Sequence, residues 1–65
     1  MITGMILAYN TDVEAGVIKG VDGKPYYFTK ADWSSPEVKP SEDIAITFIP
    51  NRGCALKVKR IPDNR

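Results

Sequence analysis

An Asp-Gly pair at residues 22–23 constrains the fold of this chain more than any other short stretch. It separates two runs of strand-forming residues, Ala15–Lys19 and Tyr26–Thr29, whose side chains alternate between two faces. A tight turn between paired strands needs positive φ, which glycine adopts without a steric penalty. The pattern predicts a β-hairpin with Tyr26 and Phe28 on the same face of its second strand.

Three further runs of strand-forming residues surround this hairpin. They lie at Ile2–Tyr9, Asp43–Ile49 and Cys54–Ile61, and a turn-forming stretch, Pro50–Gly53, separates the last two. Between the hairpin and residue 43, the segment 30–33 has room for one helical turn, whereas 34–42 contains two prolines and no periodicity, as a loop does. The 65 residues predict a single domain, an all-β, five-stranded antiparallel Greek-key barrel of the OB type with one short helical turn after strand three. Residues 62–65 are expected to fray.

Alternation within the strands also predicts which side chains fill the barrel. In the run at 43–49, every second residue from Ile44 onward is a large apolar side chain that can face the core. Trp33 follows the helical turn and is expected to plug the open end of the barrel, with Asp32 helping to hold the turn. The predicted core is Ile6, Ile18, Tyr26, Phe28, Ile44, Ile46, Phe48 and Val58.

The composition excludes several classes of function. The chain has no histidine and a single cysteine, Cys54, so it lacks the side chains for a Cys/His zinc site, for Ser–His or Cys–His catalysis and for an internal disulfide. No run approaches the roughly 20 apolar residues that cross a bilayer, and the N-terminus has no signal-peptide pattern. We therefore expect a cytoplasmic protein without membrane insertion that is not an enzyme, takes no small-molecule substrate and needs no metal or cofactor.

The sequence resembles the cold-shock domains, in particular a divergent bacterial branch of small cold-shock-like domains. Gly4–Asn10 resembles the first strand of that family, Gly16–Ile18 its first RNA-binding motif and Tyr26–Phe28 its second. The match needs no gap from Gly4 to about Phe28 and is looser beyond it. The resemblance implies an OB fold that binds single-stranded nucleic acid by stacking bases on exposed aromatic rings. Domains of this branch often precede membrane segments.

Most of the stacking rings that the resemblance implies are absent from this chain. Ala8, Ala15 and Val17 stand where the family has large aromatic side chains, and Lys30 replaces another ring. Tyr27 is the one clear stacking residue that remains. The matching positions and the nearby lysines give a candidate nucleic-acid-binding set of Tyr9, Val17, Lys19, Tyr27, Lys30 and Lys57.

Two functions therefore stay open at the level of the sequence. One is weak, largely sequence-independent binding of single-stranded RNA or DNA. The other is an OB-fold protein-interaction or accessory domain that has lost nucleic-acid binding. The net charge of +1 is a weak electrostatic signal for nucleic acid, and a fold alone does not determine a function.

Overall fold

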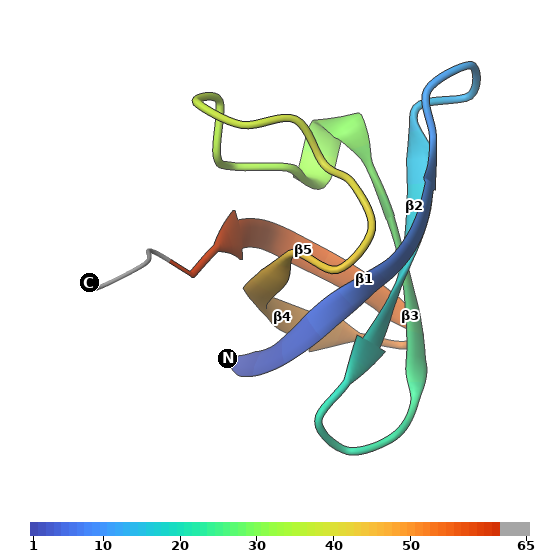
Figure 1. Cartoon of the computed structure of the whole chain (residues 1–65). Helices are drawn as coiled ribbons and strands as arrows, with labels where there is room; N and C mark the ends of the chain where they lie inside the picture. The colour runs from blue at the N-terminus through green and yellow to red at the C-terminus, as the bar shows by residue number, and fades with distance from the viewer. Residues whose placement is uncertain (62–65) are drawn as a thin grey trace.

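Five strands close into one sheet around a single core (Figure 1). The computed structural model describes residues 1–61, and the predicted frayed tail at 62–65 lies outside the described residues. A single 3-10 turn, η1 (Lys30–Asp32), follows the third strand, so the all-β, five-stranded barrel of the OB type is confirmed. The strands, in the barrel order β1-β2-β3-β5-β4, are β1 (Ile2–Asn10), β2 (Ala15–Gly20), β3 (Pro25–Thr29), β5 (Cys54–Arg60) and β4 (Ala45–Asn51).

One pair of strands departs from the antiparallel barrel that the sequence predicts. Strands β3 and β5 run parallel, whereas the other four neighbouring pairs are antiparallel. A closed ring of five strands cannot alternate direction at every step, so at least one neighbouring pair must run parallel. The long connection between β3 and β4 makes this arrangement possible, because a chain needs more than a tight turn to reach a parallel neighbour.

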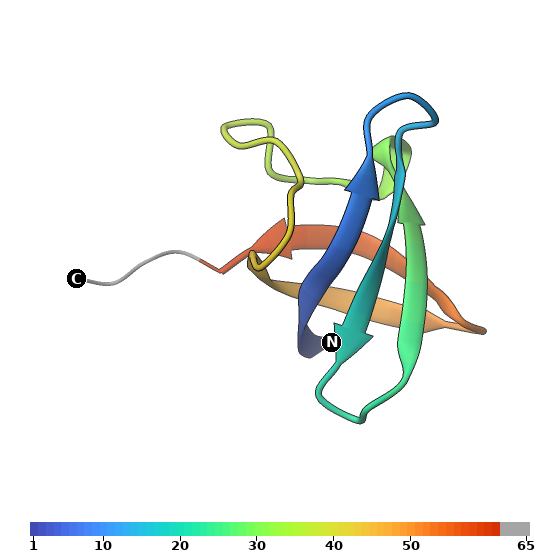
Figure 2. The same ribbon diagram turned by 45° about the vertical axis from the view of Figure 1, so that its right-hand side comes forward.

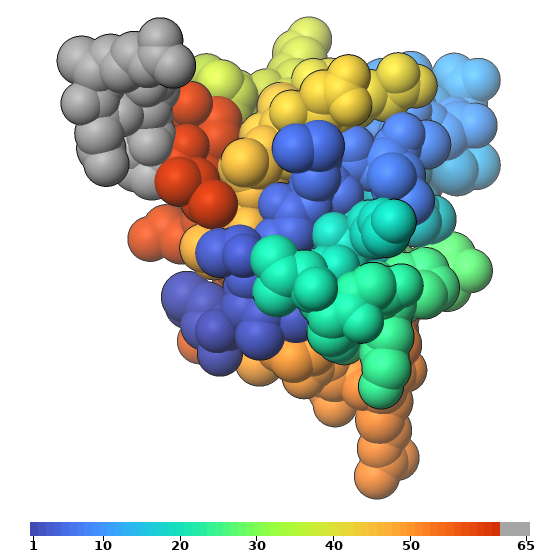
Figure 3. All heavy atoms as spheres, turned by 60° about the horizontal axis from the view of Figure 1, so that its bottom comes forward, coloured from blue at the N-terminus to red at the C-terminus, as the bar shows by residue number. Residues whose placement is uncertain are grey.

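Both predicted hairpin turns are present and use positive φ. Gly23 has φ 82° in the turn between β2 and β3. Between β4 and β5, Arg52 and Gly53 have φ 51° and 82°, the backbone that a type I′ turn requires at both central residues. Because β4 continues to Asn51, this turn is shorter than predicted. Its tip, in orange, projects from the body of the molecule in Figure 3.

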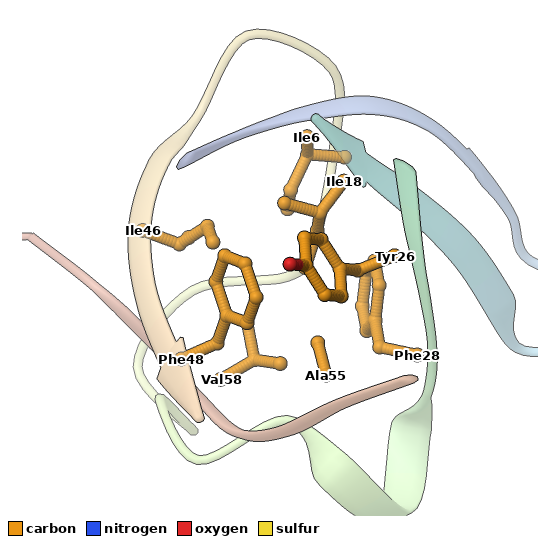
Figure 4. Close-up of a cluster of buried hydrophobic side chains, with 8 residues drawn as sticks. All are labelled: Ile6, Ile18, Tyr26, Phe28, Ile46, Phe48, Ala55 and Val58. Atoms are coloured by element: carbon orange, nitrogen blue, oxygen red, sulfur yellow. The ribbon is translucent and has the colours of Figure 1, made fainter. Parts of the chain in front are cut away.

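The core consists of eight apolar side chains that point into the barrel from all five strands (Figure 4). Ile44 was predicted to belong to it but is only partly buried, because it precedes β4 and its carbonyl oxygen accepts a hydrogen bond from the Ile6 amide at the end of the ladder. Ala55 is fully buried and was not predicted. The core residues are Ile6, Ile18, Tyr26, Phe28, Ile46, Phe48, Ala55 and Val58, so the other seven predictions are confirmed.

Two β-bulges break the alternation of side chains. In β5, the register with β4 shifts between Leu56 and Lys59, and Lys57 has φ 50°, so Ala55 and Val58 both face the core although they are three residues apart. In β1, the register with β2 shifts at Leu7. A bulge adds one residue to one strand and reverses the faces of the residues that follow it. The bulge in β1 therefore decides which of its last residues face outward.

The long connection between β3 and β4 covers one end of the barrel. It lies at the same end as the β1–β2 loop and opposite the β2–β3 turn (Figure 2). The Thr29 amide and hydroxyl both donate hydrogen bonds to the Asp32 carboxylate, at 3.1 and 3.3 Å, which holds η1 as predicted. Trp33 packs against the core, and its indole Nε1 donates to the carbonyl oxygens of Ser35 and Val38, at 2.8 and 2.9 Å.

The same connection completes the seam between β3 and β5. The two strands share only one ladder pair, Tyr27 with Cys54. Beyond it, the Ser34 amide donates to the Val58 carbonyl oxygen at 2.7 Å, and the Arg60 amide donates to the Ser35 hydroxyl at 2.9 Å. Ser35 is 3% exposed and is the one buried polar residue of the described chain. A side chain therefore replaces a strand as the hydrogen-bonding partner of this part of β5.

We expect Ser35→Ala to lower the free energy of unfolding by about 1–3 kcal/mol, because the substitution leaves the Arg60 amide without its acceptor. Urea denaturation followed by far-ultraviolet circular dichroism measures the change. Ser34→Ala is the matched control, since Ser34 is exposed and bonds to β5 through its backbone amide. Equal stability of the two variants would contradict this account of the seam.

Candidate nucleic-acid interface

The strand register brings four small or aromatic side chains into one line across the outside of the barrel. Ala8 pairs with Val17, Val17 with Tyr27, and Tyr27 with Cys54. We call these four residues the outer row. Tyr27 is 60% exposed, Ala8 and Cys54 are exposed, and Val17 is half-buried. The bulge at Leu7 is what places Ala8 opposite Val17, so the outer row depends on it.

Lysine side chains lie on both sides of the outer row along the strand direction. Lys19 is exposed and pairs with Met5 on β1 and with Pro25 on β3. Because Lys19 lies two residues after Val17 in β2, the two side chains are on the same face of that strand. On the other side, Lys30 begins η1, directly after Thr29, which pairs with Ala15. The structure thus brings together four predicted site residues, Val17, Lys19, Tyr27 and Lys30.

Lys30 is not a free cation in this structure. Its Nζ lies 3.1 Å from a Glu14 carboxylate oxygen, and its amide donates a hydrogen bond to the Glu14 carbonyl oxygen at 2.9 Å. Glu14 holds this position with φ 55°, a left-handed conformation that costs a residue with a Cβ roughly 1–2 kcal/mol. Both side chains are more than half exposed, so the ion pair itself is weak. This pair was not predicted from the sequence, because it depends on the exact register at the open end of the β2–β3 hairpin, where Ala15 pairs with Thr29.

Tyr9 lies apart from the outer row and covers one end of the core. It pairs with Gly16, which pairs with Phe28, and the rings of Tyr9 and Phe28 stack with centroids 5.7 Å apart. A Cβ at position 16 would lie 2.7 Å from a carbon of the Phe28 ring, so only glycine lets this ring lie against β2. Tyr9 is half-buried, and most of its role here is packing.

Lys57 is a second predicted site residue that the fold separates from the outer row. It lies in the β5 bulge, beyond the single ladder pair that joins β5 to β3, and no strand pairing connects it to the outer row. The resemblance was loosest in this strand, and the bulge has no signal in the sequence. Of the three predicted lysines, only Lys19 and Lys30 therefore lie near Tyr27.

One titratable pair lies at the opposite end of the hairpin. The Tyr26 hydroxyl donates a hydrogen bond to the Asp22 carboxylate at 2.7 Å, and the Lys24 amide donates to the same carboxylate at 3.1 Å. These bonds lower the pKa of Asp22 below its usual range, with the Tyr26 bond as the larger cause. The bond to Asp22 raises the pKa of the Tyr26 hydroxyl. The pair fixes the turn between β2 and β3 and lies outside the candidate interface.

Two other kinds of feature are absent from residues 1–61. Residues 1–61 contain no group of three or more Asp, Glu or Cys side chains arranged to hold a metal ion. Within the same residues, no helix is long and apolar enough to cross a bilayer. The sequence matches no known protein-family model and no curated protein. The resemblance to cold-shock domains therefore stays a prediction from the motif residues.

The Asp22–Tyr26 pair predicts a contribution to stability that disappears in acid. Because the folded-state pKa of Asp22 is depressed, its contribution is complete above the unfolded-state pKa of about 4 and is lost as the pH falls below that value. Urea denaturation between pH 6 and 2 should therefore show the stability of Asp22→Asn approaching that of the wild type as the pH falls. Asp12→Asn, which changes charge at an exposed turn, is the control and should show no such convergence. A constant difference between Asp22→Asn and the wild type over this range would contradict the assignment.

Proposed function

We propose that this chain is a non-catalytic module that binds single-stranded nucleic acid weakly and with little sequence preference. The observation that carries the proposal is the outer row, in which Tyr27 is exposed beside Val17 and Ala8 with Lys19 and Lys30 to either side. Every nucleobase has a face that can stack on a tyrosine ring, so such a surface accepts any sequence. The resemblance to bacterial cold-shock-like domains supports the same function in a cytoplasmic setting.

The proposed binding mode follows from the positions of these side chains. One base stacks on the Tyr27 ring, and the methyl groups of Ala8 and Val17 give the neighbouring base a smaller apolar contact. Lys19 and Lys30 contact phosphates on the two sides of the outer row. A single stack contributes roughly 1–3 kcal/mol, and the net charge of +1 adds little long-range attraction. Affinity should therefore be low and should depend strongly on salt.

We expect Tyr27→Ala to weaken binding of a short pyrimidine-rich oligonucleotide by about 1–3 kcal/mol, whereas Tyr27→Phe keeps the ring and should retain affinity. With phosphates contacted by Lys19 and Lys30, the slope of log K against log salt should be about −1.4. An NMR titration at low and moderate salt measures both, through the amide shifts of Tyr27, Val17 and Lys30. If millimolar oligonucleotide moves none of these resonances, the chain does not bind nucleic acid on this face.

Glu14 should reduce the affinity of this face, because its carboxylate occupies the Lys30 ammonium that would contact a phosphate. We expect Glu14→Gln to strengthen oligonucleotide binding by up to about fivefold at low salt and to steepen the salt slope by about 0.7. Glu42→Gln makes the same change of net charge in the long connection and is the matched control. Equal gains in both variants would mean that only net charge matters and that the Glu14–Lys30 pair does not limit binding.

A second function is favoured by the small size of the side chains around Tyr27. Ala8, Ala15 and Val17 line a shallow, open hollow of mixed polarity, to which the β1–β2 loop also contributes Asn10 and Thr11. A surface of this kind suits a protein-interaction or accessory domain that has lost nucleic-acid binding. Loss of all oligonucleotide response in the titration would favour this function, with the same face as the first place to seek a protein contact.

A further inference from the structure

A partly enclosed groove lies at the barrel end that the long connection covers. Its volume is about 410 Å³, and its lining is mostly apolar. The barrel contributes the aromatic residues Tyr9 and Trp33, and the connection contributes Pro36, Val38 and Pro40. Figures 1 and 2 show the connection standing beside the β1–β2 loop at this end. Two aromatic rings and two prolines in one groove form a surface suited to an apolar or proline side chain.

The groove is held in shape by contacts that do not need a ligand. Tyr9 stacks on Phe28, and the centroid of the Phe28 ring lies 6.2 Å from that of Trp33. The two hydrogen bonds from the Trp33 indole fix the carbonyl groups of Ser35 and Val38, which sets the path of the connection. A site that is already ordered costs a ligand less conformational entropy on binding.

Charge around the groove suits one carboxylate better than a chain of phosphates. Lys30 and Lys39 both line it, and Lys30 already holds a carboxylate at 3.1 Å in its exposed pair with Glu14. The same connection carries Glu37 and Glu42, which would repel a polyanion. An occupant with an apolar body and a single negative charge therefore fits this groove better than an oligonucleotide does.

We propose that this groove binds an extended, proline-containing peptide segment of a partner protein, with an acidic side chain beside its apolar anchor. Proline-rich segments are recognised by aromatic-lined grooves because their polyproline II conformation is formed before binding. The groove is half-open, so a segment that continues past both ends buries more surface than a small molecule confined within it. The anchor lies between Tyr9 and Trp33, and its acidic neighbour pairs with Lys39. The Trp33 indole N–H is already bonded within the chain, so this residue contributes its ring and not a hydrogen bond.

The sole tryptophan of the chain makes the proposal directly measurable. The probe is a capped eight-residue peptide of prolines and alanines with a central Leu-Pro-Glu sequence, titrated to millimolar concentration while Trp33 emission is recorded. We expect a saturable change in emission, together with NMR shifts of the Val38 and Lys39 amides. A peptide with lysine in place of its glutamate should bind at least about threefold more weakly, as should the variant Lys39→Glu with the original peptide. Lys59→Glu makes the same charge change on β5, away from the groove, and should bind the original peptide as the wild type does.

The outcomes separate this proposal from the one made for the outer row. An emission change that is weakened by Lys39→Glu and not by Lys59→Glu supports the peptide groove, whatever the oligonucleotide does at Tyr27. No response of Trp33 to the peptide, or equal loss in the two variants, overturns it. A six-nucleotide deoxythymidine oligomer is the competing ligand. If that oligomer alone changes Trp33 emission and Lys39→Glu weakens the change, the groove belongs to a nucleic-acid path and the peptide proposal is wrong.

Discussion

Closure of the barrel depends on the seam between β3 and β5. A ring of five strands must contain a parallel pair, and here that pair has only one ladder position, at Tyr27 and Cys54. The rest of the β5 edge is satisfied by the connection that follows η1, through the Ser34 amide and the Ser35 hydroxyl. Backbone groups left unpaired in the interior are costly, so this short segment is as much a part of the barrel as a strand. Both candidate surfaces depend on it, because it holds β5 beside Tyr27 and also forms one wall of the aromatic groove.

The two surfaces differ in how their side chains are positioned. The outer row lies on paired strands, and its alignment follows from the ladder register together with the bulge at Leu7. The groove is built from the barrel end and the connection, and the indole of Trp33 ties the two parts together. Because Tyr9 packs on Phe28 instead of joining the outer row, three aromatic rings, those of Tyr9, Phe28 and Trp33, gather at this barrel end. That distribution explains why one fold presents a sparse stacking face and a separate apolar groove.

The sequence predicted the parts of this structure that local patterns determine. Alternation and the turn at Gly23 located the β2–β3 hairpin, and the same alternation identified Ile18, Tyr26 and Phe28 as core residues. Features that depend on how the strands pair could not be predicted from the sequence. The parallel pair follows from ring closure, and the bulges at Leu7 and Lys57 have no local signal. The Glu14–Lys30 pair depends on the exact register at the open end of the β2–β3 hairpin. The register brings Val17, Lys19, Tyr27 and Lys30 to one surface, whereas Lys57, in the bulged strand, lies apart from it.

The ring order also sets a limit on when the molecule can acquire its core during synthesis. Strands β1 to β3 are neighbours in sequence and can pair as they emerge from a ribosome, but β1 also needs β4 as its second neighbour. Until residues 45–60 are available, the inner faces of Ile6, Ile18 and Phe28 remain without the side chains that cover them in the native barrel. Contacts between distant segments are slow to form because a long loop must close first. A nascent chain that stops after β3 would therefore expose an apolar three-stranded sheet, a species that binds chaperones or other chains until the last hairpin arrives.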